Sequence, residues 1–508
     1  MKRTSRRTRA GLWTVATAGC GLLLLASGSS VASTPTGGGI QLPPLPTNDL
    51  AFMISLTASQ LAAETTPVTP PGPPLRSTLS VACAAGSRPK SGMQGRVTAA
   101  DIASAAGAQG WTCNLTKVAN QRIPGGFRVW RYVDRAGHAC AFFDTSLAAP
   151  LSAVSPAVGP SLGTAVVDMS NPARPRLTAM LASLAMLSPH ESLNLNAKRG
   201  LLVAEVGNAL TLPGTLDVYS VATDCRHPQL LGQAAIATGH ESGFSPDGRT
   251  FWVAGGGGYI YAFDLTDPRH PKQLWKGAYY SHGLSLSPDG RTLYQTDPIN
   301  GNLAFLDVSQ IQLRYPHPKV REIRRITWPT VSIPQNSQAF TSGGHKYLLE
   351  FDEFAFRFNP ATIANKAGAT RIVNIDNPSA PRIVSDLRLA VQLPANHQLA
   401  SSDPTPLGNS TALGYGSHYC AMPTTVSPQI VACSELNSGL WVFNIANPAQ
   451  PKVVAYFIAP PRLGSPLPNL QGDLAFSQPA FDVARHDIWY TDAVSGFYVL
   501  HLNSAAWR

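Results

Sequence analysis

Short apolar runs alternate with turn residues along most of the chain, from Trp111 to the C-terminus. The recurring unit is an apolar run that ends in or near Asp or Asn, followed by a turn, a proline and a second apolar run. Such runs, bounded by Gly, Pro, Asn and Asp, are typical of β-strands. Seven copies occur at intervals of about 40 to 70 residues. Their apolar runs lie at residues 165–168, 216–219, 261–264, 304–307, 372–375, 442–445 and 497–500.

One copy shows the unit in full. Its expected strands lie at residues 240–244, 250–254 and 259–265, and a fourth begins at Gln273. The turn after the first strand contains Pro246-Asp247-Gly248, in which Gly adopts a positive φ at no steric cost. Four strands in a unit of this length, repeated radially, are typical of a β-propeller blade. A separate four-stranded sheet would expose its edges, whereas a closed ring protects them.

The sequence therefore predicts an all-β fold, a single seven-bladed β-propeller of four-stranded blades over residues 111–508. The seventh copy ends the chain without an outer strand. We expect Thr112–Ala119 to supply it, so that the ring is closed by an N-terminal strand. Phe127–Val133 and Ala139–Phe143 would then be the first two strands of blade one. The alternative is a pair of β-sandwiches, which short strands at regular spacing also allow.

Residues 1–33 have the pattern of an export signal peptide. Five basic residues precede an apolar run over residues 10–26, and Val31-Ala32-Ser33 offers small residues for cleavage. The alternative is an uncleaved membrane anchor, for which the run is marginal in length. No later segment is apolar enough to span a bilayer, so we expect no transmembrane segment after the signal.

The next segments connect the signal to the predicted propeller. Residues 34–80 are rich in Pro, Thr and Gly, which predicts a linker or stalk, with a helix over Asp49–Ala63. Residues 81–110 are expected to form a small N-terminal extension with a short helix near Ala99–Ala106. Thr98 and Asp101 are spaced as in a capping box at the start of that helix.

The net charge of +10 changes this picture little. Five of the 39 basic residues lie in the first nine positions, ahead of any acidic residue. The 34 that remain are scattered among 29 acidic residues. Nucleic-acid-binding proteins usually carry a basic stripe, so we expect no nucleic-acid partner.

Cysteine usage supports export. Six cysteines remain after the signal region, and an even number in an exported chain predicts up to three disulfides. We favour Cys420–Cys433, because the apolar segments around them could be neighbouring strands, and then Cys83–Cys113. The protein is expected to be exported, either extracellular or at the cell surface or in the periplasm. We expect it to be a monomer.

The repeat also carries a resemblance. The Asp-containing strand followed by Asn-Pro or Asp-Pro and a second Pro resembles the repeat of the LVIVD-repeat family of secreted bacterial propellers, over about residues 111–508. The segments Pro-His-Glu-Ser-Leu at 189–193 and Gly-His-Glu-Ser-Gly at 239–243 are similar to a subgroup of exported bacterial proteins of this kind. The resemblance implies a propeller and no settled activity.

Histidine recurs at one position of the blade, at or just before a first strand, in four of the seven copies. Blade symmetry places these imidazoles in a ring at one mouth of the channel. The turns after the second strands lie on the same face and bring in carboxylates. Acidic residues also follow two of the histidines directly. The candidate metal ligands are therefore His190, His240, His282, His418, Glu191, Glu241 and Glu353.

Neutral histidine is the commonest metal ligand and suits Zn, Cu, Fe and Ni. No motif makes a cofactor certain; a transition metal (Cu, Zn or Fe) is the one that this set of residues would bind. The selenium-binding protein family, with its methanethiol oxidases, is also a propeller with channel histidines that bind copper, a similarity of architecture alone. In the alternative interpretation, polar residues around a narrow wet channel only satisfy the backbone and water.

Two functions follow from these observations. The leading hypothesis is an exported scaffold that presents its channel-mouth face to an unknown protein, glycan or small-molecule ligand. Its basis is the expected fold, the export signal and the absence of a recognised catalytic set such as a hydrolase elbow, a phosphate loop or a dinucleotide fingerprint. The alternative is a metal-dependent enzyme, an oxidoreductase or hydrolase, at the histidine-bearing mouth. A cell-wall structural protein held by the Pro-rich stalk is a third hypothesis.

Overall fold

The chain is described by a computed structural model that covers residues 66–123, 125–145, 163–207, 214–236, 239–255, 258–353, 368–397, 403, 414–461 and 473–507. The chain divides into two compact units, Met1–Ala62 and Ala63–Arg508, and the described residues all belong to the second. The predicted signal peptide, the helix over Asp49–Ala63 and the first part of the predicted linker lie outside the described residues. No described helix is both long and apolar enough to cross a membrane.

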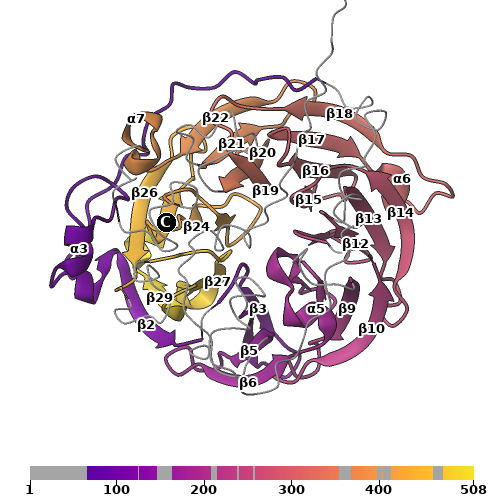
Figure 1. Cartoon of the computed structure of the whole chain (residues 1–508), viewed down its shortest axis with the longest axis horizontal. Coiled ribbons are helices and arrows are strands. Elements are labelled where there is room, and N and C mark those ends of the chain that lie inside the picture. The colour runs from indigo at the N-terminus through magenta and orange to yellow at the C-terminus, as the bar shows by residue number, and fades with distance from the viewer. Residues whose placement is uncertain are drawn as a thin grey trace, which may run out of the picture. The chain divides into compact units, whose positions relative to one another are not determined.

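Seven antiparallel sheets are arranged radially in the second unit (Figure 1), which confirms the predicted seven-bladed, all-β propeller. Blade 1 consists of β3 (Trp130–Val133), β4 (Ala139–Asp144), β5 (Thr164–Asp168) and β6 (Arg176–Leu181). Blade 2 consists of β7 (Asn194–Asn196), β8 (Leu201–Glu205), β9 (Thr215–Ser220) and β10 (Gln229–Ala235). Blade 3 consists of β11 (Gly243–Phe244), β12 (Thr250–Val253), β13 (Tyr259–Asp264) and β14 (Lys272–Ala278). Blades 4 and 5 consist of β15 (Leu284–Leu286), β16 (Thr292–Asp297), β17 (Asn302–Asp307), β18 (Arg321–Ile326); and β19 (Ile333–Ser342), β20 (His345–Glu353), β21 (Thr370–Asn374), β22 (Arg382–Leu387). Blade 6 consists of β23 (Tyr419–Ala421), β24 (Ile430–Ser434), β25 (Leu440–Asn444) and β26 (Lys452–Ile458), and blade 7 contains β27 (Ala480–Asp482), β28 (Asp487–Asp492) and β29 (Gly496–Leu502).

The described helices are short and lie in the segments outside the strands. They are α3 (Ala99–Ala103), α5 (Leu184–Leu187), α6 (Ser309–Gln312), α7 (Pro394–His397) and α8 (Ser504–Trp507), with 3-10 turns η1 (Gly107–Gln109), η3 (His190–Ser192), η5 (Ala390–Gln392) and η7 (Val483–Arg485). The predicted capping box is present at α3, where Thr98 and Asp101 exchange side-chain and backbone hydrogen bonds. The predicted short helix is therefore confirmed.

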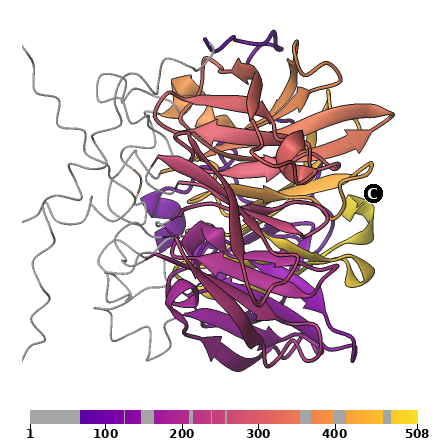
Figure 2. The same ribbon diagram turned by 90° about the vertical axis from the view of Figure 1, so that its right-hand side faces the viewer.

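The hydrophobic core lies between neighbouring blades. One cluster joins Trp252 and Ala262 of blade 3 to Leu293 and Ala304 of blade 4, all almost inaccessible to solvent. Seen from the side, neighbouring sheets lie face to face (Figure 2). Central strands are therefore buried on both faces, and they read as apolar runs rather than as alternating patterns.

The ring is closed by the N-terminal part of the propeller, as predicted. β2 (Leu115–Gln121) is the outer strand of blade 7 and pairs antiparallel with β29, so that Leu115 faces Leu502. The predicted strand is divided, however: β1 (Trp111–Cys113) pairs with β26 as a fifth strand of blade 6. The chain passes between the two blades at Asn114, whose φ of 57° breaks the extended backbone. The side-chain amide of Asn114 donates to the Val454 carbonyl, which holds this bend.

The segment before β1 runs along the outside of blades 4 to 6 (Figure 1). Val68 forms a bridge with Ile326 on β18, the Pro71 carbonyl accepts from Ile383 on β22, and Ser80 forms a bridge with Val453 on β26. The last 15 residues of the predicted linker therefore contribute backbone pairing to three outer strands. Such pairing covers strand edges that would otherwise expose unpaired N–H and C=O groups.

Three disulfides are present among the described residues, and both predicted pairings are confirmed. Cys420–Cys433 joins directly opposed residues of β23 and β24, and Cys83–Cys113 ties the N-terminal extension to β1. The third, Cys140–Cys225, joins β4 of blade 1 to the turn that follows β9 in blade 2. Three disulfides are consistent with an oxidising compartment outside the cytoplasm.

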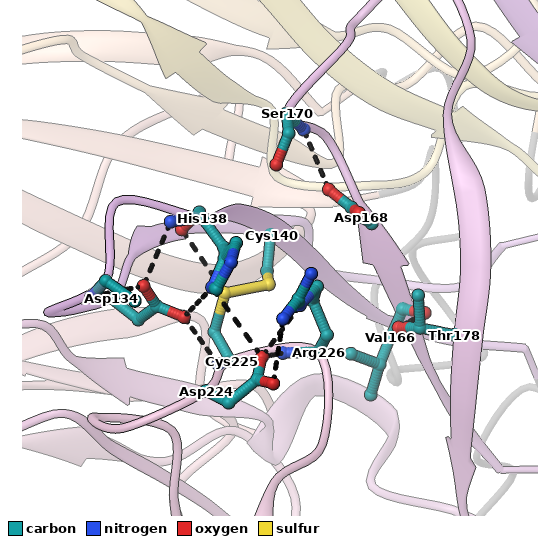
Figure 3. The surroundings of a disulfide bond; sticks show 11 residues. Asp134, His138, Cys140, Val166, Asp168, Ser170, Thr178, Asp224, Cys225 and Arg226 are labelled. Atoms are coloured by element: carbon teal, nitrogen blue, oxygen red, sulfur yellow. Dashed lines mark hydrogen bonds and ion pairs between the residues drawn. A yellow bond between two sulfur atoms is a disulfide. The ribbon is translucent and has the colours of Figure 1, made fainter.

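Hydrogen bonds surround the Cys140–Cys225 disulfide (Figure 3). The Asp134 carboxylate accepts the backbone N–H groups of Cys225 and His138, both at 2.9 Å. Asp224 pairs with Arg226 at 2.9 Å. Asp134, His138 and Asp224 lie close enough together to hold an ion. The carboxylates of Asp134 and Asp224 already accept protein N–H groups, however. We therefore interpret this cluster as a structural connection between blades 1 and 2.

We expect the Cys140→Ala/Cys225→Ala variant to lose about 4.5 kcal/mol of unfolding free energy, because this disulfide closes the longer loop in the unfolded chain. Its cysteines are 85 residues apart. The matched control is Cys420→Ala/Cys433→Ala, equally buried but with its cysteines only 13 positions apart, for which we expect a loss of about 3 kcal/mol. Urea unfolding of both variants is the measurement. An equal or larger loss in the control would contradict the prediction.

Candidate functional site

The structure brings the four predicted histidines together at one end of the channel. Each precedes the first strand of its blade: His190 lies in η3 before β7, His240 before β11, His282 before β15 and His418 before β23. The ring centroids of His190 and His240 are 4.7 Å apart, and those of His240 and His282 are 4.5 Å apart. Residues up to 228 positions apart thus share one site, because the inner strands of all blades converge on the axis.

The outer ring nitrogens of two histidines are occupied by the backbone. Nδ1 of His240 lies 3.1 Å from the Gly207 carbonyl, and Nδ1 of His418 lies 2.6 Å from the Phe476 carbonyl. A carbonyl only accepts, so each Nδ1 carries the proton and donates it. The lone pair of each neutral ring is therefore on Nε2. Nε2 of His240 points at Nε2 of His282, 3.1 Å away.

Glu191 lies among these Nε2 atoms. Its Oε2 is 3.1 Å from His240 Nε2 and 4.0 Å from His282 Nε2, and its Oε1 is 3.3 Å from His418 Nε2. Gln335, on β19 of blade 5, donates to Oε1 at 2.9 Å. Only 1% of the Glu191 side chain is exposed. This carboxylate, which belongs to blade 2, therefore lies next to the histidines of the three other histidine-bearing blades.

Glu353, from the end of β20, faces the same centre. Its carboxylate lies 2.9 Å from His282 Nε2 and 3.3 Å from His418 Nε2. Five further carboxylates, at or just after second strands, already accept hydrogen bonds from other protein groups. Asp297 accepts the backbone N–H groups of Ile299 and Asn300. The other four accept from a Ser hydroxyl (Glu205), a Trp ring N–H (Asp352), a Gln side-chain amide (Glu435) and a backbone N–H (Asp492).

Glu241 is also in the cluster, but it faces the other side of His282. Its Oε2 is 3.7 Å from His282 Nδ1. Its Oε1 accepts hydrogen bonds from Arg128 and Asn336. Gly283 makes room for this carboxylate, since a Cβ there would lie 2.2 Å from Glu241 Oε2.

Arg128 is the main site residue that the sequence interpretation missed. It precedes β3 of blade 1, and its guanidinium donates to the Asn194 side chain at 3.0 Å and the Ser242 carbonyl at 3.2 Å. It also lies 5.3 Å from the ring centroid of Tyr419 in blade 6. The sequence contained a signal for Arg128: it is the second residue of the predicted first strand of blade one, Phe127–Val133, and the start of each first strand lies at the channel.

The electrostatics of the cluster differ from one histidine to the next. Burial lowers the pKa of His190 to about 3, so this ring is neutral. Burial also acts to lower the pKa of His418, but hydrogen bonds to Glu191 and Glu353 outweigh it and raise that pKa to about 9. The histidines in turn outweigh the desolvation of Glu191 and hold its pKa well below the usual value.

The imidazoles and carboxylates at the mouth form groups of three whose possible ligand atoms lie within 4.8 Å of one another. Glu191 belongs to each of these groups. These His and Glu groups could hold a metal ion, since imidazole and carboxylate are ligands of first-row transition metals. His240 is the most open of them, with 26% of its side chain exposed, whereas the others are buried.

Comparison with known proteins does not extend this picture. No family model matches the chain, and no curated protein matches it. Among solved structures, a crystal structure titled "putative 6-phosphogluconolactonase" from Bacteroides fragilis matches with a TM-score of 0.43 and 12% identity, covering 67% of this chain and 90% of that chain. At that level of similarity the match says nothing about what this chain binds.

We expect Gly283→Ala to destabilise the protein by about 1 to 3 kcal/mol, because the new methyl group overlaps the Glu241 carboxylate and the Gln335 carbonyl. Gly243→Ala is the matched control, since a Cβ there meets nothing closer than 3.3 Å. Thermal unfolding of both variants tests this. Equal melting temperatures for the two would show that the carboxylate does not need the space.

We expect Glu435 to make the free energy of unfolding fall as pH rises. Burial raises the pKa of Glu435 to about 8 in the folded state, despite a hydrogen bond from Gln392. Between pH 4.5 and 8 the unfolded carboxyl ionises and the folded one does not, so the native state loses up to about 4 kcal/mol. Glu435→Gln should abolish this loss, and urea unfolding at pH 5 and pH 8 measures it. A parallel pH dependence in both proteins would refute the assignment.

Proposed function

We propose that this protein is an exported β-propeller that binds a first-row transition metal ion at its channel mouth. His240, His282 and His418 would hold the ion through Nε2, and Glu191 and Glu353 through their carboxylates. The observation that carries the proposal is the orientation of the histidines. Backbone carbonyls accept hydrogen bonds from the Nδ1–H groups of His240 and His418, which directs the Nε2 atom of each ring at one centre.

The distances suit such an ion. Two nitrogens that each lie about 2.1 Å from one metal are about 3.0 Å apart at a right angle and about 3.4 Å apart in a tetrahedron. Nε2 of His240 and Nε2 of His282 are 3.1 Å apart. Two neutral imidazole lone pairs at that distance repel each other unless a cation, either a proton or a metal, lies between them.

The buried carboxylates supply the charge that a divalent ion needs. Glu191 and Glu353 together balance a charge of +2, and both are almost inaccessible to solvent. A metal held there would act as a Lewis acid or as a redox centre. The partly exposed edge of His240 is the route by which a small ligand would approach. These features favour a metal-dependent oxidoreductase or hydrolase.

The scaffold hypothesis has its own supporting observation. Glu191 and Glu353 already pair with His282 and His418, so a protonated cluster satisfies itself without metal. In that case the propeller would serve to present its mouth to a protein, glycan or small ligand.

We also propose export and membership of the LVIVD-repeat family. The three disulfides and the repeat support these proposals.

We expect near-stoichiometric metal in the chain lacking residues 1–33, after incubation with Cu, Zn or Fe and removal of free ions. His282→Ala and Glu191→Gln should each lose the metal, because each removes a ligand from the centre. His270→Ala is the matched control, since 73% of that side chain is exposed and it contacts Asp267 far from the cluster. Elemental mass spectrometry gives the metal content, and circular dichroism verifies folding.

Either of two results would overturn the metal proposal. One is absence of metal from the folded wild type after incubation with all three ions. The other is equal metal content in the wild type and in a folded His282→Ala variant.

A further inference from the structure

The outer nitrogen of His282 differs from those of its neighbours. His240 and His418 direct Nδ1 at backbone carbonyls. For His282, Nδ1 is buried and makes no hydrogen bond to any described residue at normal distance. The nearest acceptor is Glu241 Oε2, 3.7 Å away, which is itself buried without a hydrogen-bond partner among the described residues.

A buried donor and a buried acceptor that face each other favour pairing, because each costs about 1–3 kcal/mol when it is left without a hydrogen bond. A shift of about 0.7 Å brings them to ordinary hydrogen-bond distance. The carboxylate of Glu241 is therefore the partner that the His282 ring requires.

Glu241 itself is held from several blades. Its Oε1 accepts from Arg128 of blade 1 and from Asn336 of blade 5. Gly283 of blade 4 lies against its Oε2 and leaves no space for a side chain between them. Arg128 is in turn oriented by the Asn194 side chain and the Ser242 carbonyl. The carboxylate is thus fixed before any ion binds.

The position of Glu241 distinguishes it from the other two glutamates. Glu191 and Glu353 approach Nε2 atoms, where a metal would lie. Glu241 approaches Nδ1 of His282, on the far side of the ring. A carboxylate that accepts the outer N–H of a ligating histidine fixes its tautomer and orientation and increases its basicity. Glu241 therefore has the place of a supporting group and not of a ligand.

We propose that Glu241 is a positioning residue for His282, that Arg128 and Asn336 hold its carboxylate, and that this arrangement directs His282 Nε2 to the metal. The inference rests on the proposed metal site. It assigns different roles to two groups of residues, with Glu191 and Glu353 contacting the ion and Glu241 acting through the imidazole.

Glu241→Gln is expected to weaken Zn²⁺ binding about 10- to 100-fold, as loss of a supporting carboxylate typically does. Competition with a chromophoric chelator measures the affinity. The visible absorption bands of bound Co²⁺ should also shift, because the orientation and basicity of one ligand change; a loss of global stability that leaves the ligands in place would not move them. The matched control is Glu350→Gln, which likewise removes a buried carboxylate from an arginine pair, here with Arg371, but away from the histidines; it should bind both ions like the wild type.

A second variant covers the case in which Glu241→Gln does not fold because Arg128 loses its charge partner. Arg128→Met/Glu241→Gln removes both charges, and replacement of a buried pair is often tolerated. It should show the same loss of affinity. Wild-type protein that binds neither ion would overturn the metal site itself. Wild-type binding with unchanged affinity and Co²⁺ spectrum in a folded Glu241 variant would overturn only the positioning role.

Discussion

The pairing of β2 with β29 closes the ring, and the geometry of the channel depends on it. Blade 7 has only three strands of its own, so without Leu115–Gln121 its outer edge would be open. Adjacent blades are held by apolar clusters between their faces, and each such cluster needs a neighbour on both sides. Only a closed ring gives every blade two neighbours. The convergence of the inner strands on one axis is a consequence of that closure.

The second constraint is the burial of charge at the axis. Arg128, Glu191, Glu241 and Glu353 come from blades far apart in sequence, and all are nearly inaccessible to solvent. Unpaired buried charges are costly, so each is placed against a partner from another blade, such as Arg128 against Glu241. These contacts align the blades with one another. The same contacts hold the imidazole rings in one orientation, which joins the stability of the ring to the chemistry of its mouth.

Glycine next to the site residues has a spatial role here. Gly126, Gly239 and Gly283 each lie where a Cβ would come within 2.2 Å of a buried carboxylate, respectively that of Asp144, Glu205 and Glu241. None of the three has the positive φ that would call for glycine on conformational grounds. Neighbouring blades can therefore bring carboxylates close to the backbone before the first strands. In the sequence, Gly239-His240 and His282-Gly283 carry this information, but the identity of the approaching acid cannot be deduced from it.

The sequence by itself determined the type of fold, the number of blades, the strand that closes the ring and two disulfide pairings. These follow from local turn chemistry and from a repeat counted along the chain, and both are properties of neighbouring residues. It also identified the four histidines, because blade symmetry converts a repeated position into a ring. The tertiary structure alone decided that Glu191 and Glu353 face Nε2 atoms, that Glu241 faces Nδ1, and that Arg128 reaches into the cluster. Those contacts join different blades at ångström distances, which depend on the twist and packing of whole sheets and are not encoded in the spacing of any one repeat.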